Sequence, residues 1–316
     1  MNKQLQAIIS ASKYWVSDQQ HITDFERHEG ELSHKKFARR LLSLYQLQPN
    51  AFDQISQKLV AGFEIEFYLA AEQIGLLAQS IEGILPRDQI LLVKLDQVPK
   101  TDGQNFYLMA EKTGCPPAGL QSYELVSPKL DPLSLIYYLN VFVKKLKQFG
   151  AKDGDDIGFH LHFSTEAHCR ISPLAVVYSL DQHGLLSFKS RKFTRDIVAQ
   201  LFSYQPEDWA FIFNRVLKKN YSINFLDFAN NNHFELRALG GKGYLFDSKH
   251  SPQGYALNSL LALTKALSYP DKKLAKLIRR QYKLDKKLVK LNQVKYASLK
   301  AKPKNAIWTS CFNSEV

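Results

Sequence analysis

The chain has 316 residues, of which 45% are hydrophobic and 23% charged, a composition typical of a folded globular protein rather than a disordered one. No apolar run reaches the roughly 18 residues that a membrane-spanning helix needs, and three cysteines cannot build a disulfide framework. We therefore expect a cytoplasmic protein with no membrane span. Residues 265–304 hold 14 Lys or Arg and 2 Asp, which accounts for the whole net charge of +12.

The hydrophobic periodicity predicts helices and strands that alternate along the chain, and hence an α+β or α/β fold. The length allows one large domain or two small ones. The elements expected, in chain order, are helices over 3–15 and 34–47, a strand over 59–69, a helix ending near 84, short strands within 89–110, a strand over 121–126, a helix over 132–149, strands over 157–164 and 185–189, helices over 193–201 and 206–219, paired strands over 221–228 and 233–239, and helices over 251–267 and beyond.

Four of the expected strands are polar on one face only. Side chains alternate between the two faces of a strand, so the apolar members of each segment can anchor it in a core while the polar members share the reverse face. The polar faces carry Glu64 and Glu66 on the first strand, Glu124 on the second, His160, His162 and Ser164 on the third, and Glu235 and Arg237 on the fourth. His233, beside a turn, is interpreted as an ordinary surface residue.

If these strands belong to one sheet, its polar face gathers four carboxylates. Carboxylates at such short range raise one another's pKa strongly unless cations neutralise them. Oxygen ligands with an occasional imidazole suit Mg²⁺ or Mn²⁺, whereas Zn²⁺ more often takes three His or Cys ligands. Arg237 is then a natural clamp for a phosphate. Metals with an arginine are the usual apparatus of phosphoryl transfer.

Known nucleotide-binding signatures are missing from the sequence. The chain has no Walker A motif, no G-x-G-x-x-G after a strand and no kinase signature. A nucleotide would therefore have to be held by a different fold. A single E-x-E or H-x-H has a simpler interpretation as a solvated strand face, so the hypothesis depends on the combination of segments.

Four motifs follow one another along the chain: Gly62–Glu66 has the form G-x-E-x-E, Glu124–Leu130 E-L-V-S-P-x-L, Gly158–Ser164 G-x-H-x-H-x-S, and Glu235–Arg237 E-L-R. In this order they resemble the motifs of the carboxylate–amine ligase superfamily, which includes glutamine synthetase and glutamate–cysteine ligase. The similarity is strongest to its amidoligase branch and covers about residues 58–245. The Ala-Leu-Gly-Gly-Lys-Gly sequence that follows Arg237 departs from that branch.

The resemblance implies an α+β fold with an antiparallel, funnel-shaped catalytic sheet and helices packed outside. It also implies an ATP- and Mg²⁺-dependent ligase that joins a carboxylate to an amine through an acyl phosphate. By this resemblance, one metal is held by Glu64, His160 and Glu235, and a second by Glu66 and Glu124. His162, Ser164 and Arg237 would contact phosphate or nucleotide, with Arg237 and Glu235 acting in catalysis.

The implied organisation has three parts: a helical N-terminal extension over 1–57, an amidoligase-like catalytic domain over 58–268 and a basic helical segment over 269–316. Two other functions stay open. One is a metal-dependent hydrolase that uses His160, His162 and Glu235 as ligands and Glu64 as base. The other is a non-catalytic protein that binds an anionic partner through the basic segment, although a solvated helix packed on the body by its leucines is the simpler explanation of that charge.

Overall fold

The computed structural model describes residues 58–85, 89–94, 103–112, 114–165, 171–186, 221–225, 228, 232–246, 251–267 and 271–282. The two N-terminal helices and the helices expected over 193–201 and 206–219 lie outside the described residues. Most of the basic C-terminal segment also lies outside them. The division into three parts therefore stays a prediction.

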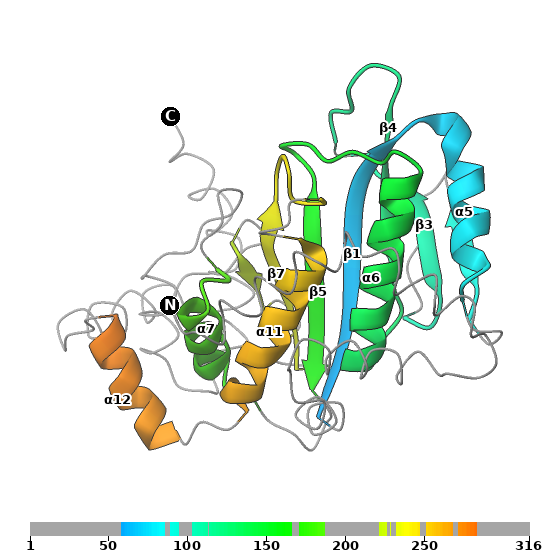
Figure 1. The fold of residues 1–316 in the computed structure, drawn as a ribbon. Helices are drawn as coiled ribbons and strands as arrows, with labels where there is room; N and C mark the ends of the chain where they lie inside the picture. Colours follow the sequence, from blue (N-terminus) through cyan, green and yellow to red (C-terminus); the bar gives the residue numbers. More distant parts are fainter. Residues whose placement is uncertain are drawn as a thin grey trace, which may run out of the picture.

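A seven-stranded sheet forms the centre of the described fold (Figure 1). Its spatial order is β2-β3-β4-β1-β5-β7-β6. The strands are β1 (Leu59–Leu69), β2 (Leu91–Lys94), β3 (Phe106–Ala110), β4 (Gln121–Val126), β5 (Gly158–Thr165), β6 (Ile223–Asn224) and β7 (His233–Gly240). The α+β class is confirmed, but the expectation of an antiparallel sheet is wrong at one edge. Here β2 and β3 run parallel, whereas every other neighbouring pair is antiparallel.

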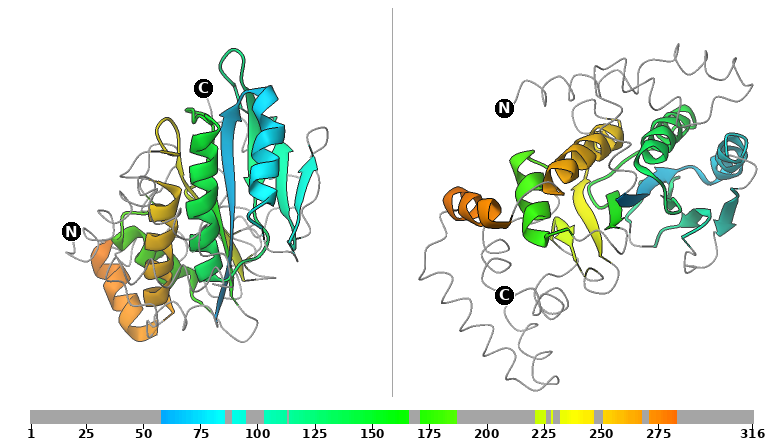
Figure 2. Two further views of the ribbon diagram at one scale, coloured as in Figure 1. Left: turned by 45° about the vertical axis from the view of Figure 1, so that its right-hand side comes forward. Right: turned by 90° about the horizontal axis from the view of Figure 1, so that it is seen from below.

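Helices cover one face of this sheet (Figure 2). They are α6 (Pro132–Gln148), α11 (Pro252–Ala266) and α5 (Ile74–Glu82), the last preceded by a short 3-10 helix over Ala71–Gln73. Aromatic rings join the layers, because Phe142 of α6 packs edge-on against Phe63 of β1 and Phe106 of β3, and Tyr255 of α11 packs against Phe159 of β5. The odd-numbered side chains of β1 thus enter the core, and alternation turns its even-numbered side chains to the other face.

Local sequence signals explain where α6 begins and ends. Asp131 caps its first turn, accepting hydrogen bonds from the backbone N–H groups of Leu133 and Ser134 at 3.1 and 3.2 Å. Pro132 occupies the first turn, where its missing N–H costs nothing. Gly150 follows the helix with φ of 79°, a left-handed conformation that glycine adopts without steric penalty. These signals confirm the predicted helix and its end.

Replacing the Asp131 cap tests this account of α6. We expect Asp131→Ala to lower the free energy of unfolding by about 1–2 kcal/mol, because two backbone N–H groups lose their acceptor. Asp131→Asn keeps an acceptor oxygen and should cost less than half as much. Urea denaturation followed by circular dichroism measures both. Equal losses for the two variants would contradict the capping role.

The structure also contains a helix that the periodicity did not predict. Helix α7 (Pro173–Gln182) packs against α11, and its run of β-branched and aromatic residues does not have an obvious helical pattern. Pro173 at its first position was the available signal. The strand predicted over 185–189 is wrong at Leu185 and Leu186, which belong to no strand, while its remaining residues lie outside the described part.

Helix α12 (Asp271–Gln281) begins the basic segment. Leu274 and Ile278 are buried against the body, and the adjoining Tyr282 donates a hydrogen bond to Asp181 at the end of α7 (2.6 Å). Lys276, Arg279 and Arg280 are exposed. Over these residues the basic segment is thus a helix that packs by its apolar stripe. None of the helices in the described part of the chain is long and apolar enough to cross a membrane.

Candidate metal centre

Strand register brings the predicted residues together on the sheet face opposite α6. Glu64 of β1 lies directly across from His160 of β5, and Glu66 lies across from Glu124 of β4. One strand further along, His162 of β5 lies across from Glu235 of β7. Since β4, β1, β5 and β7 are consecutive neighbours, polar side chains that are remote in sequence form one continuous row.

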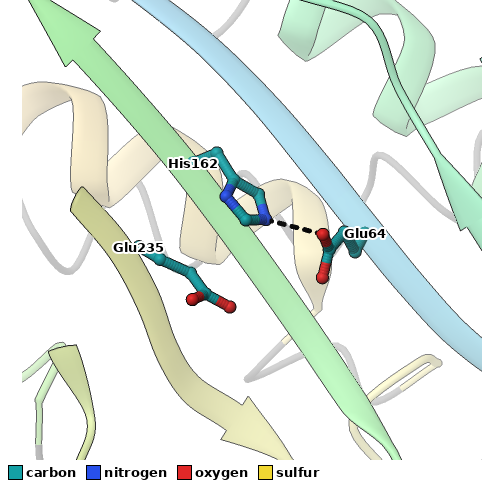
Figure 3. Close-up of side chains that lie close together, drawn as sticks. All are labelled: Glu64, His162 and Glu235. Carbon is teal, nitrogen blue, oxygen red and sulfur yellow. Dashed lines mark ion pairs between the residues drawn. The ribbon is translucent and has the colours of Figure 1, made fainter. Parts of the chain in front are cut away.

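Glu64 lies at the centre of this row and contacts both histidines. Its Oε2 lies 2.8 Å from His160 Nδ1, and its Oε1 lies 3.1 Å from His162 Nε2. Figure 3 shows the second contact, with Glu235 projecting from β7 toward the same space. His160 is nearly fully buried, whereas Glu64 and His162 are each about one quarter exposed. The cluster is therefore a partly enclosed site rather than a solvated strand face.

Glu235 connects the row to Arg237. Its Oε1 forms an ion pair with the Arg237 guanidinium and lies 3.5 Å from His160 Nδ1, while its Oε2 accepts a hydrogen bond from the buried Asn224 at 3.0 Å. Both carboxylate oxygens are thus oriented by neighbours. The Nε of Arg237 is buried and, within the described residues, has no hydrogen-bond partner, so it can still donate to a ligand.

Glu66 is held by the backbone at the other end of the row. Its Oε2 accepts a hydrogen bond from the N–H of Gly158 at 2.6 Å, and its Oε1 lies 4.0 Å from His160 Nε2. A Cβ at position 158 would come within 3.0 Å of the carbonyl oxygen of Leu239 and 4.0 Å of Glu66 Oε2. The glycine of the G-x-H-x-H-x-S motif is explained by this close approach.

Three groups of possible cation ligands follow one another along the sheet. In each group one ligand atom per residue lies within 4.8 Å of the others. The groups are Glu64, His162 and Glu235; Glu64, Glu124 and His160; and Glu66, Glu111 and Glu124. Glu64 and Glu124 each belong to two groups. Mixed carboxylate and imidazole ligands fit Mg²⁺ or Mn²⁺ in chemical type.

The crowded carboxylates shift one another's pKa. Burial, together with the nearby charges of Glu64 and Glu66, raises the pKa of Glu124 to about 9. Burial also raises the pKa of Glu66. For Glu64 burial acts in the same direction, but hydrogen bonds with His160 and His162 outweigh it and hold the pKa well below its usual range. The acidic end of the row thus binds protons in the absence of a cation.

At the other end of the row, beside His160 and His162, the carboxylate pKa values are lowered instead of raised. Burial alone would lower the pKa of His162, but its hydrogen bond to Glu64 reverses the effect and raises that pKa. Burial raises the pKa of Glu235, yet the charges of His162, His160 and Arg237 together bring it below its usual value. Glu64 and Glu235 therefore present ionised oxygens at neutral pH, which is the form that a cation binds.

All eight residues singled out from the sequence lie on this face. The carboxylates and imidazoles come together, Arg237 joins them through Glu235, and Ser164 joins through His233, whose Nδ1 lies 3.1 Å from Ser164 Oγ. The roles expected for the individual residues stay predictions. His162, expected at phosphate, also lies in a group of possible cation ligands.

Sequence reasoning missed two residues of the site. Glu111 directly follows β3 and joins the acidic end of the row; it lies two residues after Met109, which pairs with Glu124, so it continues the same strand face. His233 is not an ordinary surface residue: it is half-buried and stacks on His162, with ring centroids 5.4 Å apart. Its place in the alternating series with Glu235 and Arg237 was a usable signal. Comparison with known proteins found no matching family model and no significantly matching curated protein.

Proposed function

We propose that this protein is an ATP- and Mg²⁺-dependent carboxylate–amine ligase of the amidoligase type. The observation that supports the proposal most is the row of three adjacent ligand groups, joined through Glu64 and Glu124, with Arg237 beside them. A triphosphate that meets a carboxylate brings several negative charges to one place. A row of cation sites with a guanidinium at one end is suited to neutralising them.

The residues present fit divalent cations bound at two or more positions. Glu64, His162, Glu235 and His160 would hold a cation near the phosphates, and Glu66, Glu111 and Glu124 would hold one near the acceptor carboxylate. Bound Mg²⁺ or Mn²⁺ would supply Lewis acidity and charge neutralisation. Asn224 orients Glu235, and Gly158 orients Glu66, so that the ligand oxygens are preorganised.

The proposed reaction has two steps on the substrates. The acceptor carboxylate oxygen attacks the γ-phosphorus of ATP, the bond to the bridging oxygen breaks, and ADP leaves. An amine then attacks the acyl carbon, phosphate leaves, and an amide remains after loss of a proton. Arg237 would contact the transferred phosphoryl group. Positioning and charge neutralisation would provide most of the rate enhancement, without a side-chain nucleophile.

Nucleotide binding tests this proposal directly. Calorimetry of the full-length protein with Mg²⁺ and ATP or ADP should show saturable binding that disappears in EDTA. Release of ADP should then depend on an added pool of carboxylates and amines, such as amino acids and peptides. Absence of any Mg-nucleotide binding would overturn the proposal. A cytoplasmic location belongs to the same proposal, because ATP is the co-substrate.

Arg237 provides a more specific prediction. We expect Arg237→Ala to weaken MgATP binding about 10–100-fold, because a buried charge-assisted contact to phosphate is worth about 1.5–3 kcal/mol. Mn²⁺ binding without nucleotide should change less than threefold. Arg280→Ala on the exposed face of α12 is the matched control and should behave as the wild type. Equal MgATP affinity in Arg237→Ala and Arg280→Ala would contradict the role of Arg237.

A metal-dependent hydrolase is the second candidate. One observation favours it: His160 and His162 both lie beside Glu64 and Glu235, an arrangement richer in imidazole than Mg²⁺ usually selects. Metal analysis of the purified protein separates the two. One tightly bound Zn²⁺ with hydrolysis that needs no nucleotide would favour the hydrolase.

A binding role for the basic segment is the third candidate. The exposed Lys276 and Arg280 face away from the buried stripe of α12 and are available to an anionic partner. Such binding would weaken steeply with salt, whereas the ligase proposed here would not depend on this segment.

A further inference from the structure

A chain of hydrogen-bonding groups leads away from the candidate metal centre behind His162. His162 Nδ1 lies 3.3 Å from His233 Nε2, and His233 Nδ1 lies 3.1 Å from Ser164 Oγ. The two rings are stacked with an interplanar angle of 19°. The β5–β7 register sets this arrangement, because Ser164 lies directly across from His233.

The orientation of protons along this chain depends on what His162 Nε2 contacts. A neutral imidazole has one N–H donor and one acceptor nitrogen. Because Nε2 faces the Glu64 carboxylate at 3.1 Å, the favoured tautomer of a neutral His162 has its proton on Nε2. Nδ1 then accepts from the Nε2–H of His233, and the Nδ1 of His233 accepts from the hydroxyl of Ser164.

A cation between Glu64 and Glu235 would reverse this order. With the lone pair of Nε2 directed to a metal, His162 would carry its proton on Nδ1. Nδ1–H would then donate to Nε2 of His233, whose own Nδ1–H would donate to Ser164 Oγ. One proton would pass from His233 to His162 and one from Ser164 to His233. The Nε2 proton would leave to solvent and Ser164 would regain one from it, so the total protonation of the three side chains would be unchanged.

We propose that His233 is a positioning residue which, with Ser164, orients His162 so that its Nε2 is available to a divalent cation. This inference rests on the proposed function, because that function requires a cation beside Glu64 and Glu235. His233 would not touch the cation or the substrate. It would supply the acceptor for Nδ1–H, and its stacked ring would hold the plane of the His162 ring.

Two substitutions separate the hydrogen-bonding role from the packing role. His233→Phe keeps a stacked ring but removes the acceptor, whereas His233→Gln keeps an acceptor near the position of Nε2 but removes the ring. The full-length protein is titrated with Mn²⁺ alone by calorimetry, and pulsed electron paramagnetic resonance measures nitrogen coupling from coordinated imidazole. His162→Phe defines the coupling that belongs to His162, and His183→Gln at the end of α7 is the matched control.

We expect His233→Phe to weaken Mn²⁺ binding about 10–100-fold and to lose the same nitrogen coupling as His162→Phe. His233→Gln should retain affinity within about threefold of wild type and keep that coupling, since one neutral hydrogen bond changes little when an acceptor remains. Equal weakening by Phe and Gln would overturn the proposal, because ring packing would then explain the effect. Wild-type affinity in His233→Phe would also overturn it.

A second variant applies if His233→Phe does not fold. Ser164→Ala removes the terminal acceptor and leaves both rings, and we expect it to weaken Mn²⁺ binding about threefold or more. Unchanged Mn²⁺ affinity and nitrogen coupling in Ser164→Ala would contradict the proposed orientation of His162 by His233 and Ser164. The two proposals fail differently. Wild-type protein that binds no Mn²⁺ refutes the metal-dependent function itself. If the wild type binds Mn²⁺ and the variants bind it equally well, only the proposed role of His233 and Ser164 is refuted.

Discussion

Glu64→Gln should strongly weaken divalent-cation binding at two neighbouring positions at once. Glu64 is the residue shared by the groups that contain His162 and His160, and its two oxygens contact one histidine each. Glutamine keeps the size and one acceptor oxygen but loses the charge. We expect Mn²⁺ affinity to fall at least about 100-fold and ATP-dependent ADP release at least about 1,000-fold.

The matched control for this substitution is Glu82→Gln, at the exposed end of α5. It makes the same chemical change far from the polar face and should leave Mn²⁺ binding unaltered. Thermal unfolding in EDTA distinguishes loss of function from loss of structure, because Glu64→Gln should unfold within a few degrees of the wild type. Mn²⁺ bound by Glu64→Gln as tightly as by Glu82→Gln would contradict the central place of Glu64.

Glu124→Gln should have opposite effects on stability and on metal binding. The pKa of Glu124 in the folded protein is raised to about 9, from 4.5 for a free side chain. Between these values the folded state holds a proton that the unfolded state releases. Stability therefore falls as pH rises through this window, by up to about 1.4 kcal/mol per pH unit for one isolated group.

A neutral glutamine removes that dependence. In EDTA, Glu124→Gln should flatten the fall of stability between pH 5 and pH 9 and unfold at a higher temperature than the wild type at pH 8. With Mn²⁺ present, the wild type should instead unfold at a higher temperature than the variant. At 100 times its dissociation constant Mn²⁺ would stabilise the wild type by about 2.7 kcal/mol, and it should stabilise the variant far less. Parallel pH profiles of the two proteins in EDTA would contradict the raised pKa.

The wild-type protein should also release protons when Mn²⁺ binds at neutral pH. Glu124 is protonated there without a cation and must ionise to act as a ligand. Calorimetry in buffers of different ionisation enthalpy measures the number released. This number should be lower in Glu124→Gln, which has no proton to lose at that position.

Strand alternation predicted much of this site before any coordinates. Leu59–Leu69 was expected as a strand and is β1 with the same bounds, because a long apolar series with glutamates at every second place has only one consistent face for them. The common orientation of Glu64, Glu66, Glu124, His160 and Glu235 followed from the same reasoning. What alternation could not supply was the cross-strand register, which depends on pairing between segments up to about a hundred residues apart.

Each feature that the sequence analysis missed has a specific physical cause. The parallel pairing of β2 with β3 depends on the connection between them, for which the short runs within 89–110 gave no signal. Glu111 lies one residue beyond the runs expected within 89–110, so its strand face was not considered, although it continues the face of Met109 beside Glu124. His233 was judged by its neighbouring turn instead of by its strand face. In both cases the strand face, and not the neighbouring turn or loop, identifies the residue.

An anomalous-scattering map of crystals grown with Mn²⁺ and an ATP analogue tests the central claim most directly. The account predicts Mn²⁺ peaks on the polar face of the sheet, within ligand distance of Glu64 and Glu235 at one position and of Glu66 and Glu124 at another, with the analogue's phosphates beside Arg237. A map at saturating Mn²⁺ with no peak among these carboxylates would contradict it.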